Sequence, residues 1–591
     1  MSATRATDEQ AAAINSTHRY RVIVAHPGTG KTFTLARIVG ELVRRFRTPE
    51  AVTAVTFTRN AAAELRDRIA GIVGERDARR IHIGTSTAIA LKILRSKPSA
   101  YGYPDEITVY DDTDAADVLD DIRVRLGLDH KVSTKRAREL IEAKRRGEPG
   151  EWTREEERLT SEYVETLRRA GAVEVAEIID RAVWLMAHDA DVRDRFQYRA
   201  RCLVVDEYHD TAPNERELYR VLDPREVVIV GDPNQEIYGF RGTSNQFLLG
   251  AAADEASEVH ILSRSFRSDR AIVAAARNLI ARNPAQPDRA IEARPGAAPG
   301  AVHARRFTAW PDHDEAIVEI VRGASHRGES SAVLVRTNRE VALIIRAIRA
   351  AGVEVVPLSS ERSFLALSEV RLYHAMIRAA INPRDEIAAR LVMDADPDLP
   401  RWRSPDGFTA RIAARQNDQA VLDVVGWTDQ HSIDDPGAYA DQARREIVER
   451  YEGDGLHTRA TNVEEAALRA AQWLDDHPGE GLTEYLDSIT AIELGDMTAP
   501  DETIPRVGTA HAAKGLEFDV VVVAGMVDGS FPLAPRRDAD PVAHLWEERR
   551  LFYVAATRAR HTLYVMSCTP PDDPRRQVVS QFVGEMLTPP T

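Results

Sequence analysis

Residues 25–32 read AHPGTGKT, and they lie between an apolar segment, Tyr20–Ala25, and the start of an amphipathic one. A glycine-rich turn between a strand and a helix is typical of a P-loop, whose backbone N–H groups surround phosphate oxygens. Lys31 is expected to neutralise the β- and γ-phosphates, and the Thr32 hydroxyl to hold Mg²⁺. Ala25 stands where the strict pattern has its first glycine, but the flanking strand and helix favour a phosphate site over a chance turn.

A second apolar segment ends in two carboxylates. Residues 203–210 read LVVDEYHD, so Asp206 and Glu207 follow a predicted strand. A carboxylate there can hold the Mg²⁺ that bridges the phosphates, and its neighbour can position or deprotonate the attacking water. The pair is weak evidence alone, but together with a P-loop it predicts a nucleoside triphosphatase.

Short strands alternate with longer helices along much of the chain. The strands are rich in Val and Ile and almost continuously apolar, as parallel strands buried on both faces are. This alternation predicts α/β domains built on parallel sheets. The predicted strands are Tyr20–Ala25, Ala51–Phe57, Cys202–Asp206, Val227–Val230, Ala332–Arg336 and Val520–Ala524, with helices such as Lys31–Arg45 and Ala61–Ile72 between them.

Two regions interrupt the alternation. Residues 97–197 and 385–504 are predicted to be mainly helical, and we interpret them as domains inserted into the α/β cores. The stretches 283–299 and 570–591 are predicted to be loops or linkers. A chain of 591 residues is too long for one hydrophobic core and suits three or four domains.

Composition excludes several classes of protein. Two cysteines rule out a disulfide scaffold, a zinc-finger array and a four-cysteine iron–sulfur cluster. No apolar run reaches the ~20 residues that a membrane span needs, and the first residues do not resemble a signal peptide. We therefore expect a cytoplasmic protein that does not associate with membranes.

The net charge of −15 is concentrated in one segment. Residues 385–505 hold 27 acidic residues, 10 Arg and no Lys, a net of −17, whereas residues 131–146 (KVSTKRARELIEAKRR) carry +5. Both runs can be solvated helix faces, which is the usual case. The alternative is an electrostatic division between a part that faces nucleic acid and a part that avoids it.

Five further segments form an ordered series that resembles the helicase motifs of superfamily 1, in particular the UvrD/Rep/PcrA group. With the two motifs above, the resemblance extends from Gln10 to about Arg560. The segments are TFTRNAAAELRDRI (56–69), VGDPNQEIYGFRG (230–242), LSRSFRS (262–268), VGTAHAAKGLEFDVV (507–521) and EERRLFYVAATRAR (547–560).

The resemblance implies an α/β fold with two RecA-like parallel-sheet cores, each carrying a mainly helical inserted subdomain. The first core would comprise residues 1–96 and 198–261, with its insertion at 97–197. The second core would comprise residues 262–384 and 505–591, with the acidic insertion at 385–504.

The resemblance also implies the members of an ATP site. Glu207 would be the catalytic base, Gln235 the γ-phosphate sensor, and Thr32 and Asp206 the Mg²⁺ ligands, with Lys31 on the phosphates. Arg267 and Arg558 would complete the site from the second core, and Gln10 would read the adenine. The other implied ATP contacts are Ala25, His26, Pro27, Gly28, Thr29, Gly30, Phe33, Phe266, Gly515 and the ribose ligand Glu517.

Single-stranded DNA is the second ligand that the resemblance implies. Aromatic side chains stack on bases without reading their sequence. Stacking does not sense the 2′-hydroxyl either, so RNA stays open as a substrate. The implied positions are Phe57, Tyr238 and Phe240 for the bases, and Arg59, Thr85, Arg241 and His511 for the backbone.

The chain departs from the family pattern at several positions. Phe33 stands in place of an arginine near the base, Phe266 in place of a tyrosine, and His209 in place of a glutamine. The segment GTSTA (84–88) lacks an aromatic residue and a histidine, which puts one DNA contact in question. The acidic insertion departs most: we expect it to repel phosphate, and to dock a protein or act as an inhibitory gate.

Three functions follow from this pattern. The first is an ATP-dependent motor that moves 3′→5′ on single-stranded DNA and unwinds duplex at junctions, in bacterial DNA repair or recombination near the nucleoid. The second is a DNA-stimulated ATPase or translocase subunit of a repair or phage-defence complex. The third is a nucleotide-gated binding module with vestigial hydrolysis, against which the intact catalytic positions argue.

Overall fold

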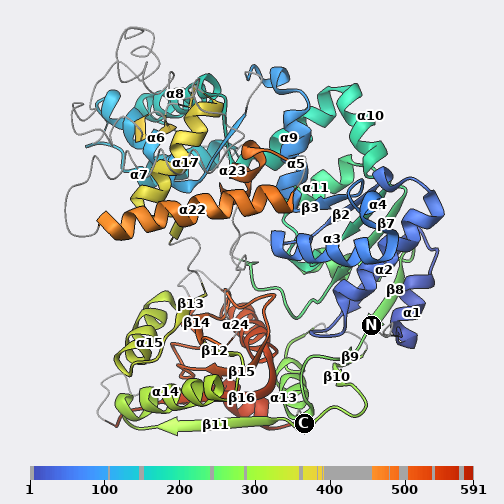
Figure 1. Ribbon diagram of the computed structural model, residues 1–591, viewed down its shortest axis with the longest axis vertical. Coiled ribbons are helices and arrows are strands. Elements are labelled where there is room, and N and C mark those ends of the chain that lie inside the picture. Colours follow the sequence, from blue (N-terminus) through green and yellow to red (C-terminus); the bar gives the residue numbers. More distant parts are fainter. Residues whose placement is uncertain are drawn as a thin grey trace. The chain divides into compact units, whose positions relative to one another are not determined.

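The chain divides into two units by its internal contacts (Figure 1). Unit 1 comprises Met1–Ile89, Asp189–Ser360 and Glu493–Thr591, and unit 2 comprises Ala90–His188 and Glu361–Ile492. In the described part of the chain, no helix is long and apolar enough to cross a membrane. The computed structural model describes residues 5–103, 107–128, 130–145, 152–239, 245–284, 289–358, 364–382, 456–477, 480–490, 503–535, 540–571 and 578–589, with single residues between 384 and 391.

Unit 1 contains two six-stranded sheets in which all pairs of neighbouring strands are parallel, so it is an α/β unit with two RecA-like cores, as predicted. The six predicted strands are confirmed to within two residues at each end. The first sheet has the order β3 (His82–Gly84), β2 (Val52–Val55), β6 (Cys202–Val205), β7 (Glu226–Gly231), β1 (Tyr20–Ala25) and β8 (Glu258–Leu262). The second has the order β11 (Ala301–Phe307), β16 (Ala559–Cys568), β15 (Phe518–Val523), β12 (Ser331–Val335), β14 (Arg506–Thr509) and β13 (Val356–Pro357).

Helix α2 (Lys31–Phe46) explains how the first sheet places the P-loop. Its apolar residues recur at helical spacing and bury one face against the sheet, in a cluster with Val204 and Val228. The predicted helix at 61–72 is confirmed as α3 (Arg59–Val73). Because α2 starts directly after the turn that follows β1, its first residue, Lys31, lies at the carboxyl edge of the sheet.

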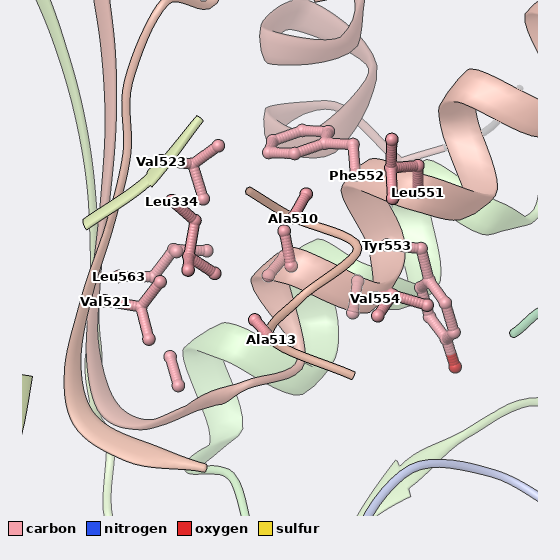
Figure 2. Packing of buried hydrophobic residues seen from close by; sticks show 14 of the residues in the cluster. Leu334, Ala510, Ala513, Val521, Val523, Leu551, Phe552, Tyr553, Val554 and Leu563 are labelled. Atoms are coloured by element: carbon pink, nitrogen blue, oxygen red, sulfur yellow. The ribbon is translucent and has the colours of Figure 1, made fainter. Parts of the chain in front are cut away.

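The second core is built around a helix that is buried on all sides at its carboxyl end. Every residue of α24 (Pro541–Ala556) from Leu551 to Ala556 is buried. Figure 2 shows part of this core: Leu334, Val521, Val523 and Leu563 from three strands, Ala510 and Ala513 from the loop after β14, and residues 551–554 of the helix. This packing fixes the segment directly after the helix, which contains Arg558.

The carboxyl-terminal stretch corrects one prediction. Residues 570–591 were expected to be loop or linker, but they contain helix α25 (Gln581–Leu587), whose Phe582 and Met586 join the second core. The Phe582 ring stacks on Phe552 with 6.1 Å between ring centroids. A seven-residue helix with few buried residues carries too little periodicity to be recognised from sequence. The described part of 283–299 is mostly loop, as expected, with one short strand, β10 (Glu292–Ala293).

The first insertion is mainly helical, as predicted, with a two-stranded sheet that was not predicted. That sheet pairs β4 (Thr108–Tyr110) with β5 (Ala172–Glu174). The helices are α6 (Asp112–Arg125), α7 (Thr134–Arg145), α8 (Arg154–Ala170), α9 (Ile178–His188) and α10 (Ala190–Arg199), of which α10 belongs to unit 1.

The basic run at 131–146 forms α7 and the loop before it. Its basic side chains pair with acidic ones of neighbouring helices: Arg136 with Glu156 at 3.0 Å, and Arg138 with Asp112 at 3.1 Å. The Arg138–Asp112 pair is exposed and the Arg136–Glu156 pair is partly exposed. Both favour the solvated-face interpretation of this run over a surface prepared for phosphate.

A buried ionic cluster joins the two insertions inside unit 2. Arg378 of α17 (Ser368–Ile381) donates to Asp114 and to Asp385, at 2.8 and 2.9 Å, and Tyr110 donates to Asp385 at 2.8 Å. Burial raises the pKa of Asp114 to about 6, against the lowering effect of Arg378. Two further helices, α22 (Leu456–Asp476) and α23 (Leu482–Thr490), pack on α17. Most of 385–504 lies outside the described residues, so a gate or a protein dock there stays a prediction.

The role of the tail helix can be tested by Phe582→Ala. Removing this ring from the second core should lower the free energy of unfolding by about 3–5 kcal/mol. Urea denaturation followed by intrinsic fluorescence measures this as an earlier unfolding transition. Leu587→Ala is the matched control, since Leu587 ends the same helix and is exposed; it should change stability by less than about 0.5 kcal/mol. Equal effects of the two substitutions would contradict the buried packing of α25.

Candidate functional site

A cavity of about 780 Å³ in unit 1 gathers most of the predicted nucleotide residues. Loops at the carboxyl edge of the first sheet form one wall, and segments of the second core form the other. This is the edge at which parallel α/β sheets usually bind ligands. The predicted residues that line it are Pro27, Gly28, Gly30, Lys31, Thr32, Phe33, Phe57, Asp206, Glu207, Gln235, Tyr238, Phe266, Arg267, Gly515, Glu517 and Arg558.

Two glycines shape the P-loop. Gly28 and Gly30 have φ angles of 71° and 81°, in the left-handed region that favours glycine. A Cβ atom on Gly28 would lie 2.5 Å from the Cβ of Arg267. The Gly28 carbonyl also accepts a 2.7 Å hydrogen bond from the Phe266 N–H. The glycine therefore lets the second core approach the loop. Ala25 is the last residue of β1 and has no positive φ, so that position does not require glycine.

Three predicted ATP contacts hold the loop from behind and do not line the cavity. The Gln10 amide nitrogen donates to the Thr29 carbonyl at 3.0 Å, and its oxygen accepts from the Thr7 N–H at 3.0 Å. The Thr29 hydroxyl donates to the His26 carbonyl at 2.8 Å. Gln10 is buried in this arrangement. Its predicted contact with adenine stays a prediction.

An ion pair between Lys31 and Glu207 lies at the centre of the cavity. The Lys31 Nζ donates to both oxygens of Glu207, at 2.9 and 2.8 Å. Burial alone would lower the pKa of Lys31, but the charges of Glu207 and Asp206 outweigh it and raise that pKa. Burial alone would raise the pKa of Glu207, but the charge of Lys31, with a smaller effect of Lys514, holds it far below its usual range. Both side chains are therefore charged. Glu207 also has a φ of 49°, a strained value of the kind that clusters at functional sites.

Asp206 and Thr32 fit a Mg²⁺ site by the chemistry of their donors. Mg²⁺ prefers oxygen ligands and is usually bound by one or two carboxylates together with phosphates. Burial and then the neighbouring Glu207 charge raise the pKa of Asp206 to about 7. One Asp206 oxygen accepts from the Glu207 N–H at 2.9 Å. A buried carboxylate whose charge is disfavoured in this way would be stabilised by a divalent cation.

The second core contributes two arginines in different states. Arg267 is paired with Glu517, whose pKa burial would raise but Arg267 and Arg560 lower. Arg558 is 2% exposed, and burial, followed by the Arg267 charge, lowers its pKa to about 9. Among the described residues, the acceptors of its hydrogen bonds are uncharged: the Val554 and Leu516 carbonyls, the Thr557 hydroxyl, and the Gln235 side chain at 3.3 Å. A buried guanidinium with neutral acceptors favours the entry of an anion.

The loop at 232–239 is held by side chains of the second core. Arg550 donates to the Glu236 carbonyl at 2.9 Å and to its carboxylate at 2.8 Å. Lys514 donates to the Gln235 carbonyl at 2.8 Å. The sequence did not single out Lys514 or Arg550, although each lies within a quoted motif. The signal that could have identified them is that each is a basic residue in a motif whose other positions were assigned roles.

Only some of the predicted DNA residues lie close to one another. Phe57 and Tyr238 stack on each other at 5.1 Å, and Lys514 lies 5.0 Å above the Tyr238 ring. Tyr238 is fully buried here, so a base could reach it only after its surroundings move. Thr85 is buried and caps α5 (Ser86–Arg95), because its hydroxyl accepts from the Ala88 N–H at 3.2 Å. Arg59 is the first residue of α3, and the His511 ring lies 6.4 Å from that of Tyr238. Phe240 and Arg241 lie outside the described residues.

Phe33 shows how the chain replaces the arginine of the family pattern. It lines the cavity, and the Arg37 guanidinium lies 4.3 Å from its ring centroid. Residues four apart share a helix face, so a cation still lies close to the predicted base position. An aromatic ring backed by a cation offers stacking without hydrogen bonds that read one base.

The close approach at Gly28 can be tested with Gly28→Ala. The new Cβ would meet Arg267 and Ser265 in a strained backbone conformation, which should weaken nucleotide binding roughly 10-fold or more. Titration with a fluorescent ADP analogue measures the change. Gly71→Ala in α3 is the control, since nothing lies within 4 Å of the added atom. Unchanged affinity of the Gly28 variant would show that the loop does not need this approach.

Comparison with known proteins agrees with this geometry. Residues 6–255 match the UvrD/REP helicase N-terminal domain, and residues 260–446 and 444–570 match the UvrD-like helicase C-terminal domain. The chain is similar to the ATP-dependent DNA helicase UvrD1 of Mycobacterium tuberculosis, with 29% identity over 92% of this chain and 80% of that protein. It is 26% identical to DNA helicase II of Haemophilus influenzae, over 96% and 84%, and 25% identical to the ATP-dependent DNA helicase PcrA of Staphylococcus aureus, over 98% and 86%. The chain therefore belongs to the family of UvrD-like helicases.

Proposed function

We propose that the chain is an ATP-dependent DNA helicase that moves 3′→5′ on single-stranded DNA and unwinds duplex at junctions, in DNA repair or recombination in the bacterial cytoplasm. One observation carries this proposal. A single cavity brings the Lys31–Glu207 pair of the first core together with Arg267 and Arg558 of the second. Membership of the UvrD-like helicase family and the names of the relatives support DNA as the substrate and ATP-dependent unwinding as the reaction.

Hydrolysis would begin with the exchange of partners by Lys31. Incoming phosphates would compete with Glu207 for the Lys31 ammonium group, because the phosphates carry more negative charge than the carboxylate. Once Lys31 leaves, burial raises the pKa of Glu207 towards its usual range and above. The carboxylate then becomes a stronger base and can accept the proton of the attacking water. ATP binding would thus prepare its own catalytic base.

The same competition would act on the second core. Arg558 is already buried beside Gln235, and Arg267 can exchange Glu517 for a γ-phosphate. Such arginines are typically worth about 10³–10⁵ in turnover. Thr32 and Asp206 would hold Mg²⁺, which would supply charge neutralisation on the phosphates. After hydrolysis the arginines return to protein acceptors, and the attraction between the cores weakens.

Movement on DNA would follow from the loop at 232–239. Gln235 and Tyr238 lie three residues apart on this loop and both line the cavity. A shift of the loop would therefore move the predicted γ-phosphate sensor together with a member of the proposed base-stacking pair. Arg550 and Lys514 attach the loop to the second core. Opening and closing of the cavity would therefore change the exposure of Tyr238, and with it the grip on a base.

A second candidate is a translocase subunit of a larger repair or defence complex. The charge of the segment 385–505, −17 without a lysine, supports it, because such a segment repels duplex and suits a protein partner. Vestigial hydrolysis is the weaker alternative, because the charged members of the ATP site are intact and lie together.

Glu207→Gln tests the catalytic base. The variant should bind nucleotide at least as tightly as the parent, since a neutral amide competes less with the phosphates for Lys31, and should lose roughly 10²–10⁴-fold in DNA-stimulated turnover. Steady-state phosphate release gives the rate, and a fluorescent nucleotide gives the affinity. Glu41→Gln, an exposed residue on α2 that pairs with Arg44, is the matched control. Turnover within a few-fold of the parent would remove Glu207 from this role.

Strand displacement tests the proposed function as a whole. Single-stranded DNA should stimulate ATP hydrolysis, and duplexes with a 3′ tail should be unwound while those with a 5′ tail are not. Stimulation without displacement of either substrate would favour the translocase-subunit candidate. Hydrolysis that DNA does not stimulate would contradict both candidates, and equal stimulation by a matched RNA strand would extend the substrate.

A further inference from the structure

His209, the residue that departs from the family pattern, lies in a fully buried cluster between the two sites. It belongs to a short 3₁₀ helix (Tyr208–Asp210) directly after Glu207. Its Nδ1 accepts the Asp232 N–H at 3.1 Å, and its Nε2 lies 3.2 Å from the Lys514 Nζ. A Cβ on Gly231 would lie 3.0 Å from its Nδ1, so this glycine leaves room for the ring.

The proton on the ring follows from these contacts. Burial, and then the charge of Lys514, lower the pKa of His209 well below its usual value, so the ring is neutral. Because Nδ1 is an acceptor, the single proton of the neutral ring is on Nε2. Nε2 lies 3.5 Å from an oxygen of Asp210, which is also the oxygen that accepts from Lys514. The ring N–H and the Lys514 ammonium therefore both face this carboxylate oxygen.

Lys514 is the element that this cluster holds in place. It reaches from the second core into the first, is 7% exposed, and donates to Asp210 and to the Gln235 carbonyl. Its ammonium also lies 5.0 Å from the Tyr238 ring centroid and 5.8 Å from that of Phe57. Burial raises the pKa of Asp210 to about 7, so its carboxylate needs nearby donors to stay ionised beside Lys514.

We propose that His209 is a positioning residue that couples the nucleotide site to the DNA site: it orients Asp210, which holds Lys514 against Gln235 on one side and the Phe57–Tyr238 pair on the other. The inference rests on the proposed function and deepens it. His209 Nδ1 lies 3.6 Å from Glu207 Oε2, so a route from the catalytic carboxylate to the aromatic pair passes through His209 and Lys514. Loss of the Nε2 side of His209 should therefore loosen the coupling between the two ligands.

Two amide substitutions separate the two sides of the ring. Glutamine is the residue of the family pattern at this position, and His209→Gln places an amide where Nε2 lies, so its N–H can face Asp210 as the ring N–H does. His209→Asn places its oxygen where Nδ1 lies, so it keeps only the contact with the Asp232 N–H. If His209 served only to pack its loop, it would need the contact with the Asp232 N–H and not the contact with Asp210.

The readout is the coupling between the two ligands. The affinity for a short fluorescein-labelled oligothymidylate is measured by anisotropy, with and without a non-hydrolysable ATP analogue, and the ratio of the two affinities gives the coupling. We expect His209→Gln to keep this ratio, and His209→Asn to shift it towards one by roughly 5-fold. The ratio of DNA-stimulated to basal ATPase should fall in parallel. Thermal melting of each variant reports whether it is folded.

A double-mutant cycle with Lys514→Met tests the route itself. If His209 acts through Lys514, adding His209→Asn to the Lys514→Met chain should change the coupling no further. Additive effects would overturn the proposal, and so would an Asn variant that matches the parent while the Gln variant does not. If both amide variants match a parent that DNA stimulates, the inference fails and the helicase function stands. If DNA does not stimulate the parent, both fail.

Discussion

The Lys31–Glu207 ion pair is the interaction on which the rest of the site depends. It is partly buried, it uses both oxygens of Glu207, and it joins two loops that the first sheet brings to one edge. Burial makes either charge costly without the other, so the two residues stay paired until a ligand with more negative charge enters. We propose that the pair occupies the Glu207 carboxylate until phosphate replaces it as the partner of Lys31.

The second core would respond to phosphate binding through cationic side chains that extend into the first core. Arg558 contacts Gln235, Arg550 contacts Glu236, and Lys514 contacts the carbonyl of Gln235. All three act on the loop that also carries Tyr238. A short loop held at several points by another domain transmits displacement better than it absorbs it. We therefore propose that the mechanical link between nucleotide and DNA lies in this loop and in the cations around it.

Sequence predicted the parts that depend on local pattern and missed those that depend on distant contacts. The buried parallel strands are continuously apolar, and the P-loop lies between such a strand and an amphipathic helix, so both were recognised. The tail helix around Phe582 was missed because its stability comes from the second core and not from its own periodicity. The burial of Tyr238 and the reach of Lys514 into the first core arise only when segments almost 280 residues apart are brought together. These two features could not be predicted because the contacting segments are far apart in sequence, although both residues lie within recognised motifs.

Closure of the two cores on nucleotide is the central claim, and it can be measured by energy transfer between one dye on each core. Both native cysteines are buried, so dyes can be attached at Gly71→Cys and Leu343→Cys, two exposed positions on α3 and α15 (Asn338–Ala350). Single-molecule measurements should show higher transfer with a non-hydrolysable ATP analogue than with ADP, and Arg558→Ala should remove the difference. Transfer that is the same with both nucleotides would contradict a site that the two cores complete together.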